Sequence, residues 1–199
     1  IMLLLTGALV GAVLSGDLLT FFIFWEAATA AAAFLMLYRK NAFSLNATLK
    51  YLVMVIIASA FVLFGLSIVY GITGSLNYIA VREAIGTITG ADMNLLIIAF
   101  IFVAAGYAIE AAIVPFHFWL PDAYTAAPAP SAAFLSALVD QGSYYILIRL
   151  LLFIVLPESV GGVFDWTLMM AVLAALTMVV GNIFALIQNN IKRLIAYIC

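Results

Sequence analysis

The residues of this chain that could do chemistry are a few ionisable side chains set inside long apolar runs. Glu26, Glu110 and Asp140 each lie well within such a run, and Pro115 interrupts the run that contains Glu110. An ionisable group in the hydrocarbon of a membrane costs several kcal/mol, so each of these acids is a candidate for function. A helix interrupted at membrane depth persists only inside protein or beside a wet cavity. Together these features are typical of the midplane ion site of a transporter rather than of an enzyme pocket.

The composition favours an integral membrane protein. Of the 199 residues, 68% are hydrophobic and 8% are charged, whereas a soluble domain carries about 25% charged residues. The net charge is −2 and the seven Lys and Arg residues are scattered, which leaves no basic surface for nucleic acid. The sequence has one Cys, Cys199, so no intrachain disulfide can form. It has one His, which gives no cluster of metal ligands. Since the sequence also lacks a nucleotide fingerprint, we expect this chain to bind no cofactor of its own.

The apolar runs predict an all-α, polytopic bundle of about six membrane crossings and the start of a seventh, because about 20 helical residues span the hydrocarbon core. We expect crossings at residues 2–15, 18–38, 47–70, 94–119, 131–156 and 166–188, and a short interfacial helix over 77–85. Pro115 lacks an amide hydrogen and disfavours helical geometry in the residue before it. We therefore expect one broken helix, the fourth, with its break at Val114.

Residues 1–199 begin and end within apolar runs, and no basic leader or cleavage site of a signal peptide is visible. We therefore expect a fragment of a single transmembrane domain that belongs to a longer protein.

The basic residues predict how the bundle is oriented, because cytoplasmic loops carry an excess of Lys and Arg. This rule places the connections 39–50, 120–131 and 189–193 in the cytoplasm, with Arg82 alone marking the opposite side. No loop is long enough to form a soluble catalytic domain. The function must therefore lie within the helices.

Glu26 lies about 12 Å along its helix, at a rise of about 1.5 Å per residue. Aromatic residues precede it and small residues follow it, which lets a neighbouring helix approach closely. Glu110 lies just before the break, where a carboxyl group can carry a proton or bind a cation. The alternatives are a protonated Glu26 that makes one interhelical hydrogen bond, and a Glu110 that pairs with Arg149 or Lys50.

Asp140 and its neighbour Gln141 open a polar cluster, DQGS, which is typical of a hydrated path through a helix bundle. The alternative is a structural hydrogen bond made by Asp140. His117 follows the break and could relay protons to the cytoplasm, because its ordinary pKa is near 6.5, or it could cap the frayed helix. Lys50 could lie between Glu26 and the bundle interior, or could extend its ammonium group to the membrane surface.

Four motifs carry a resemblance to a known family: SGDLLTFFIFWEA at 15–27, VPFHFWLPDAYTAAPAPSAAFLSAL at 114–138, YYILIR at 144–149 and ALIQNNIKRLIAY at 185–197. They resemble the antiporter-like proton-translocating subunits of respiratory complex I (NADH-quinone oxidoreductase), membrane-bound hydrogenases and multisubunit sodium/proton antiporters. The resemblance implies a fourteen-helix protein made of inverted five-helix repeats, each with a broken helix. This chain would contain the first inverted repeat, the next helix and the start of another.

The resemblance also implies roles for individual residues. Glu26 matches a glutamate that modulates a lysine on the broken helix, and Glu110 occupies the position of that lysine. Gln141 aligns with the next proton-carrying position, with Asp140 adjacent, and His117 matches the motif after the break. With two acids in place of a glutamate and a lysine, either one carboxyl group stays protonated or a metal cation stands between them. Sodium coupling and the loss of pumping are therefore both open.

The implied function is a proton-translocating, or sodium-translocating, subunit in the inner (plasma) membrane of a prokaryote. Its partners would be the lipid bilayer and other membrane subunits of a complex that holds the redox centres and quinone. A sodium ion is the one ligand left open for this chain, and the parent complex and electron donor are open as well. Two alternatives remain, a stand-alone secondary carrier for a small solute and a non-pumping structural membrane subunit.

Overall fold

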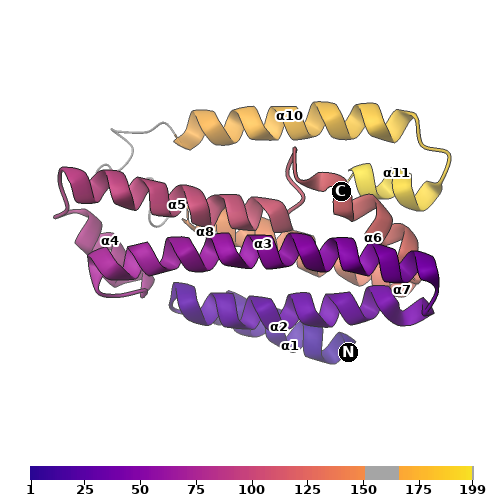
Figure 1. Ribbon diagram of the computed structural model, residues 1–199, viewed down its shortest axis with the longest axis horizontal. Coiled ribbons are helices and arrows are strands. Elements are labelled where there is room, and N and C mark those ends of the chain that lie inside the picture. The colour runs from indigo at the N-terminus through magenta and orange to yellow at the C-terminus, as the bar shows by residue number, and fades with distance from the viewer. Residues whose placement is uncertain (151–165, 199) are drawn as a thin grey trace.

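The computed structural model describes residues 1–150 and 166–198, and this part of the chain folds into helices without a β-sheet (Figure 1). The α-helices are α1 (Met2–Leu14), α2 (Leu18–Met36), α3 (Ala42–Thr73), α4 (Tyr78–Ile85), α5 (Ala91–Glu110), α6 (Leu120–Ala126), α7 (Ala129–Phe134), α8 (Gln141–Leu150), α10 (Trp166–Leu186) and α11 (Ile191–Ile198). Short 3-10 helices η1 (Leu37–Arg39) and η2 (His117–Trp119) and a π-helical segment η3 (Leu135–Asp140) complete the described elements.

Polar residues at the helix ends explain where several helices begin. Asp17 accepts a hydrogen bond from the Thr20 amide at 2.7 Å and so starts α2. Asn41 and Ser44 form a reciprocal capping box that starts α3. Because of this cap, α3 begins five residues before the range expected for the third crossing. Asn77 caps α4, which forms within the range predicted for a short helix.

Four of the described helices, α2, α3, α5 and α10, are long and apolar enough to cross a membrane. The first expected crossing is the shorter helix α1. The fifth expected crossing, 131–156, is divided among α7, η3 and α8, and its residues 151–156 lie outside the described part of the chain. The π-helical segment was not expected from the sequence.

Helix α5 ends at Glu110, four residues before the break expected at Val114. Ala112 adopts a left-handed conformation with φ of 52°, and the amide of Ile113 donates to the carbonyl of Ala108. A left-handed residue after the last helical turn ends a helix in this way. Our expectation for the break was therefore wrong in position, because the turn at Ala112 ends the helix before Pro115 does. That α5 and α6 are halves of one crossing, within an inverted repeat, stays a prediction.

The centre of the bundle is the contact between α3 and α5, which run side by side (Figure 1). A side chain at Gly65 would meet the Ala99 carbonyl at 2.6 Å. A side chain at Gly106 would meet the Ala58 carbonyl at 2.7 Å. The two glycines therefore allow the helix backbones to approach closely, as small residues do between membrane helices.

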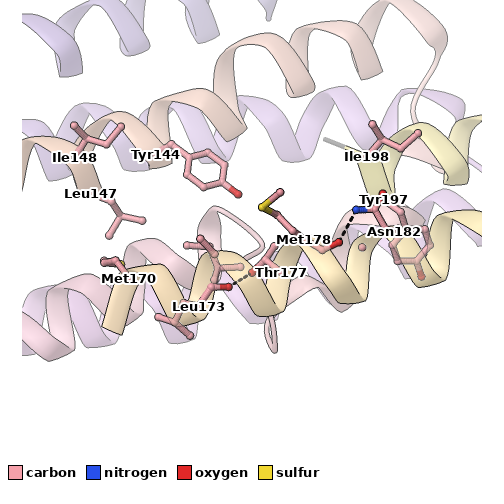
Figure 2. A pocket seen from close by; sticks show the side chains of 13 residues that line it. Tyr144, Leu147, Ile148, Met170, Leu173, Thr177, Met178, Asn182, Tyr197 and Ile198 are labelled. Carbon is pink, nitrogen blue, oxygen red and sulfur yellow. Dashed lines mark hydrogen bonds between the residues drawn. The ribbon is translucent and has the colours of Figure 1, made fainter. Parts of the chain in front are cut away.

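Helix α10 is attached differently, since among the described elements it packs chiefly against α11. Trp166 and Ala185 are its only buried residues. An apolar cavity of about 540 Å³ separates it from α8, with Tyr144, Leu147, Leu173 and Thr177 among the lining residues (Figure 2).

We predict that Gly65→Ala and Gly106→Ala each destabilise the protein by about 1–3 kcal/mol, because a methyl group would overpack the interface between α3 and α5. Gly71→Ala is the matched control, since Gly71 is also in α3 and a side chain there meets nothing within 4 Å. The thermal unfolding midpoint of the complete protein in detergent measures the effect. Equal midpoints for all three variants would contradict the close contact.

Candidate functional site

The structure brings Glu110 into contact with Trp25, the residue directly before Glu26 in α2. The indole N–H of Trp25 donates a hydrogen bond to the Glu110 carboxyl group. Glu110 is 4% exposed, at the last turn of α5. Glu26, the next residue after Trp25 in α2, accepts a hydrogen bond from the Ser59 hydroxyl at 2.6 Å. The two acids are thus linked through Trp25, which precedes Glu26 and contacts Glu110.

Aromatic rings surround Trp25 on the side of the buried Glu110. Trp25 stacks on Phe21 with ring centroids 5.7 Å apart and meets Tyr107 edge-on at 6.5 Å. Tyr51 is buried beside them and donates through its hydroxyl to the Thr29 carbonyl. Water has little access to Glu110 in this arrangement, so its charge state depends on the few polar groups that contact it.

Asp140 lies at the end of the π-helical segment and is 5% exposed. Its Oδ2 accepts a hydrogen bond from the Tyr124 hydroxyl, while no described group bonds to its Oδ1. A cavity of about 50 Å³ lies between Asp140 and His117, whose Nδ1 likewise has no partner among the described residues. Thr177 and Tyr144 also line this cavity. Two residues that each carry a buried polar atom without a described partner therefore line one small cavity.

Gln141, by contrast, is exposed at the start of α8 and does not line the small cavity. The sequence singled it out as part of the polar cluster DQGS and through the resemblance, but Asp140 and not Gln141 lines the small cavity with His117.

Lys50 belongs to a cluster of charges at one end of the bundle, with Asp122 at its centre. Asp122 accepts from Lys50 at 2.7 Å and from Arg193 at 2.8 Å. Lys192 donates to the Ala127 carbonyl at 2.8 Å, and its burial and the neighbouring Arg39 lower the pKa of this lysine. The cluster joins the beginning of α3, α6 and α11, which lie at the same end (Figure 1). All three connections predicted to be cytoplasmic thus meet in one place.

The ammonium group of Lys50 therefore contacts Asp122, and its side chain is 51% exposed. Arg149, the other alternative partner of Glu110, donates to the carbonyls of Val13 and Ser15. Its guanidinium carbon lies 4.2 Å from the centre of the Tyr78 ring. These contacts join the end of α8 to the end of α1 and to α4.

Sequence reasoning did not single out Trp25, Ser59, Tyr124 or Thr177, although each contacts or lies beside one of the acids. The available signal for Trp25 was its place beside Glu26 in the apolar run FFIFWEAA. The other three carry hydroxyl groups in helices, which by themselves are common and indicate nothing specific.

Comparison with known proteins assigns the chain to a class. The family model described as NADH:quinone oxidoreductase/Mrp antiporter, transmembrane, matches residues 15–198. The chain therefore belongs to this family of membrane subunits, which confirms the family and the all-α, polytopic fold predicted from the sequence.

Individual relatives are similar to this chain over most of its length. NADH-quinone oxidoreductase subunit N of Desulforamulus reducens is 38% identical over 185 residues, which cover 92% of this chain and 37% of the relative. A chain of the membrane-bound sulfane sulfur reductase, an archaeal respiratory membrane complex, is 32% identical with a TM-score of 0.89, covering 98% of this chain and 39% of that one. A chain of the Mrp complex from Dietzia sp. is 28% identical with a TM-score of 0.84, covering 98% and 35%. This chain thus spans less than two fifths of the length of these relatives.

We predict that Asp122→Asn destabilises the protein by about 1–3 kcal/mol, because one carboxylate serves two cations and its loss leaves both without a counter-charge. Lys50→Gln removes only one half-exposed partner and should cost less than about 1 kcal/mol. The thermal unfolding midpoint of the complete protein, measured at low and high salt, separates the two. Equal losses in the two variants would show that Asp122 does not join these helices.

Proposed function

We propose that this chain is part of an ion-translocating membrane subunit of a complex I-like oxidoreductase or a multisubunit cation/proton antiporter. The names of its relatives support this, since they include a quinone oxidoreductase subunit and a chain of an Mrp complex. In this proposal Glu26, Glu110 and Asp140 carry the ion through the membrane.

The observation that carries the proposal is the buried acid Glu110, held by Trp25 beside Glu26. Two carboxyl groups that interact in an apolar site do not titrate independently, because ionising one makes ionising the other harder. A proton or cation that reaches one acid therefore changes the affinity of the other for its own proton. Such coupling is what an ion path needs, and a purely structural acid would need only a hydrogen bond.

The cavity between Asp140 and His117 extends the path toward the charged end of the bundle. A single buried water needs about 15 Å³ and two to four polar partners. This cavity offers about 50 Å³, and Asp140, His117, Tyr144 and Thr177 are among the residues that line it. In the proposed path, water in the cavity passes protons between Asp140 and His117, and His117 exchanges them with the cytoplasm.

The surroundings of the subunit follow from the same proposal. The lipid bilayer and other membrane subunits cover its apolar surface, in the inner membrane of a prokaryote, and the redox centres and quinone belong to other subunits. The proton is the first candidate for the transported ion, and sodium is the alternative that two acids at one site allow.

We predict that Glu110→Gln abolishes ion flux in vesicles that contain the full-length complex under an imposed pH gradient, because glutamine is nearly isosteric but binds neither a proton nor a cation as a carboxylate does. Flux is measured with and without sodium in the wild type and the variant. A wild type that works without sodium carries protons through Glu110, and one that requires sodium uses Glu110 as a cation ligand.

Glu83→Gln is the matched control, since Glu83 is an exposed acid on α4. It should leave flux unchanged. If Glu110→Gln behaves like Glu83→Gln, Glu110 is not in an ion path and the subunit is better explained as a structural membrane subunit.

A second prediction concerns the small cavity. Ala196 lines it and is 3% exposed, so Ala196→Leu fills the space between Asp140 and His117. We expect flux to fall to a small fraction of the wild-type value at an unchanged protein level. Ala171→Leu, at an exposed position of α10, controls for the added bulk. Full flux in Ala196→Leu would show that no ion passes through this cavity.

A further inference from the structure

The side chain of Trp25 connects three helices close to Glu26 and Glu110. It belongs to α2, directly before Glu26, and its indole N–H donates to Glu110 at the end of α5. Its ring lies against Gly142 in the first turn of α8, two residues after Asp140. The proposed ion path consists of the three acids and His117, and it does not by itself require Trp25.

The indole ring lies close to Gly142, so a side chain at this position would collide with it. A Cβ atom at Gly142 would lie 2.4 Å from Cζ3 and 2.8 Å from Cη2 of Trp25. Glycine lowers the stability of a helix interior relative to alanine, so its presence here has a reason other than helix formation. Phe21 stacks on Trp25 at 5.7 Å with an interplanar angle of 12°. The ring that carries the N–H group therefore has contacts from both α2 and α8.

The effect of the N–H group on Glu110 depends on charge. A donor hydrogen-bonds more strongly to an ionised carboxylate than to a protonated carboxyl group. In a buried site with little water, this one donor contributes much of the stabilisation of the ionised state. The orientation of Trp25 therefore sets how readily Glu110 releases its proton.

We infer that Trp25 is the positioning residue for Glu110, and that Gly142 provides the space on α8 that aims the indole N–H at the carboxyl group. This inference rests on the proposed function, in which Glu110 carries the ion. It adds a neutral, non-titrating donor to the path and connects the helix of Asp140 to Glu110 through one ring.

The test compares Trp25→Phe and Gly142→Ala in vesicles that contain the full-length complex, with flux measured across a range of pH. Trp25→Phe keeps an aromatic ring and removes the donor, so the pH of half-maximal flux should rise by about one unit. Gly142→Ala keeps the donor and displaces the ring, so the midpoint should rise in the same direction. Gly7→Ala is the control for a glycine replaced within a helix, because a side chain there meets nothing within 4 Å.

The double variant separates positioning from general damage to packing. A phenyl ring does not reach as far toward α8 as an indole ring, so Trp25→Phe with Gly142→Ala should have the midpoint of Trp25→Phe alone. If the two substitutions act independently, their shifts add instead. The infrared carboxyl band that disappears in Glu110→Gln gives a second readout, and it should change frequency in Trp25→Phe.

The outcomes distinguish this inference from the proposed function. If Glu110→Gln leaves flux and its pH profile unchanged, the proposed function fails. If Glu110→Gln abolishes flux but Trp25→Phe and Gly142→Ala retain the wild-type midpoint and carboxyl band, Glu110 carries the ion and Trp25 does not position it. Additive shifts in the double variant would likewise overturn the role of Gly142.

Discussion

The constraint on which the rest of the structure depends is the burial of the Glu110 carboxyl group among apolar helices. A carboxylate without a partner in such a place is strongly unfavourable, and Trp25 supplies the partner from the neighbouring helix α2. That bond requires the Trp25 side chain to reach from α2 to the last turn of α5. It also requires α8 to present a glycine, Gly142, where any larger residue would collide with the ring.

Within residues 1–150 and 166–198, the charged contacts of Asp122 and of Arg149 lie at the two ends of the bundle. At one end Asp122 joins Lys50 and Arg193, and at the other Arg149 holds the end of α1 and the Tyr78 ring. Such contacts are worth little individually where water screens them, but they fix which helix ends meet. The interior is thereby left to the acids and their neutral donors, so cations fixed at the ends do not neutralise the buried acids.

The sequence was sufficient to predict the membrane class and the four long apolar helices, and to single out the three acids as candidates, because apolar runs and isolated charges are local features. It did not place the end of α5, since the left-handed turn at Ala112 is not signalled by an alanine, whereas Pro115 is conspicuous. It did not predict the π-helical segment before Asp140 either. The bond from Trp25 to Glu110 joins residues 85 positions apart, and no periodicity within one helix indicates it. Lys50 was ambiguous for the same reason, because its partner Asp122 is distant in sequence.

A tryptophan donor has different electrostatic consequences from the lysine that the resemblance implies at position 110. A lysine brings its own positive charge to a neighbouring glutamate, so the pair can be neutral without any mobile ion. The indole N–H of Trp25 orients and stabilises a carboxylate but carries no net charge. Under the proposed function, Glu26 and Glu110 therefore reach neutrality only by taking up positive charge. The mobile proton or cation is then the positive charge that neutralises the two carboxyl groups. When it arrives or leaves, the net charge of the Glu26 and Glu110 site changes directly.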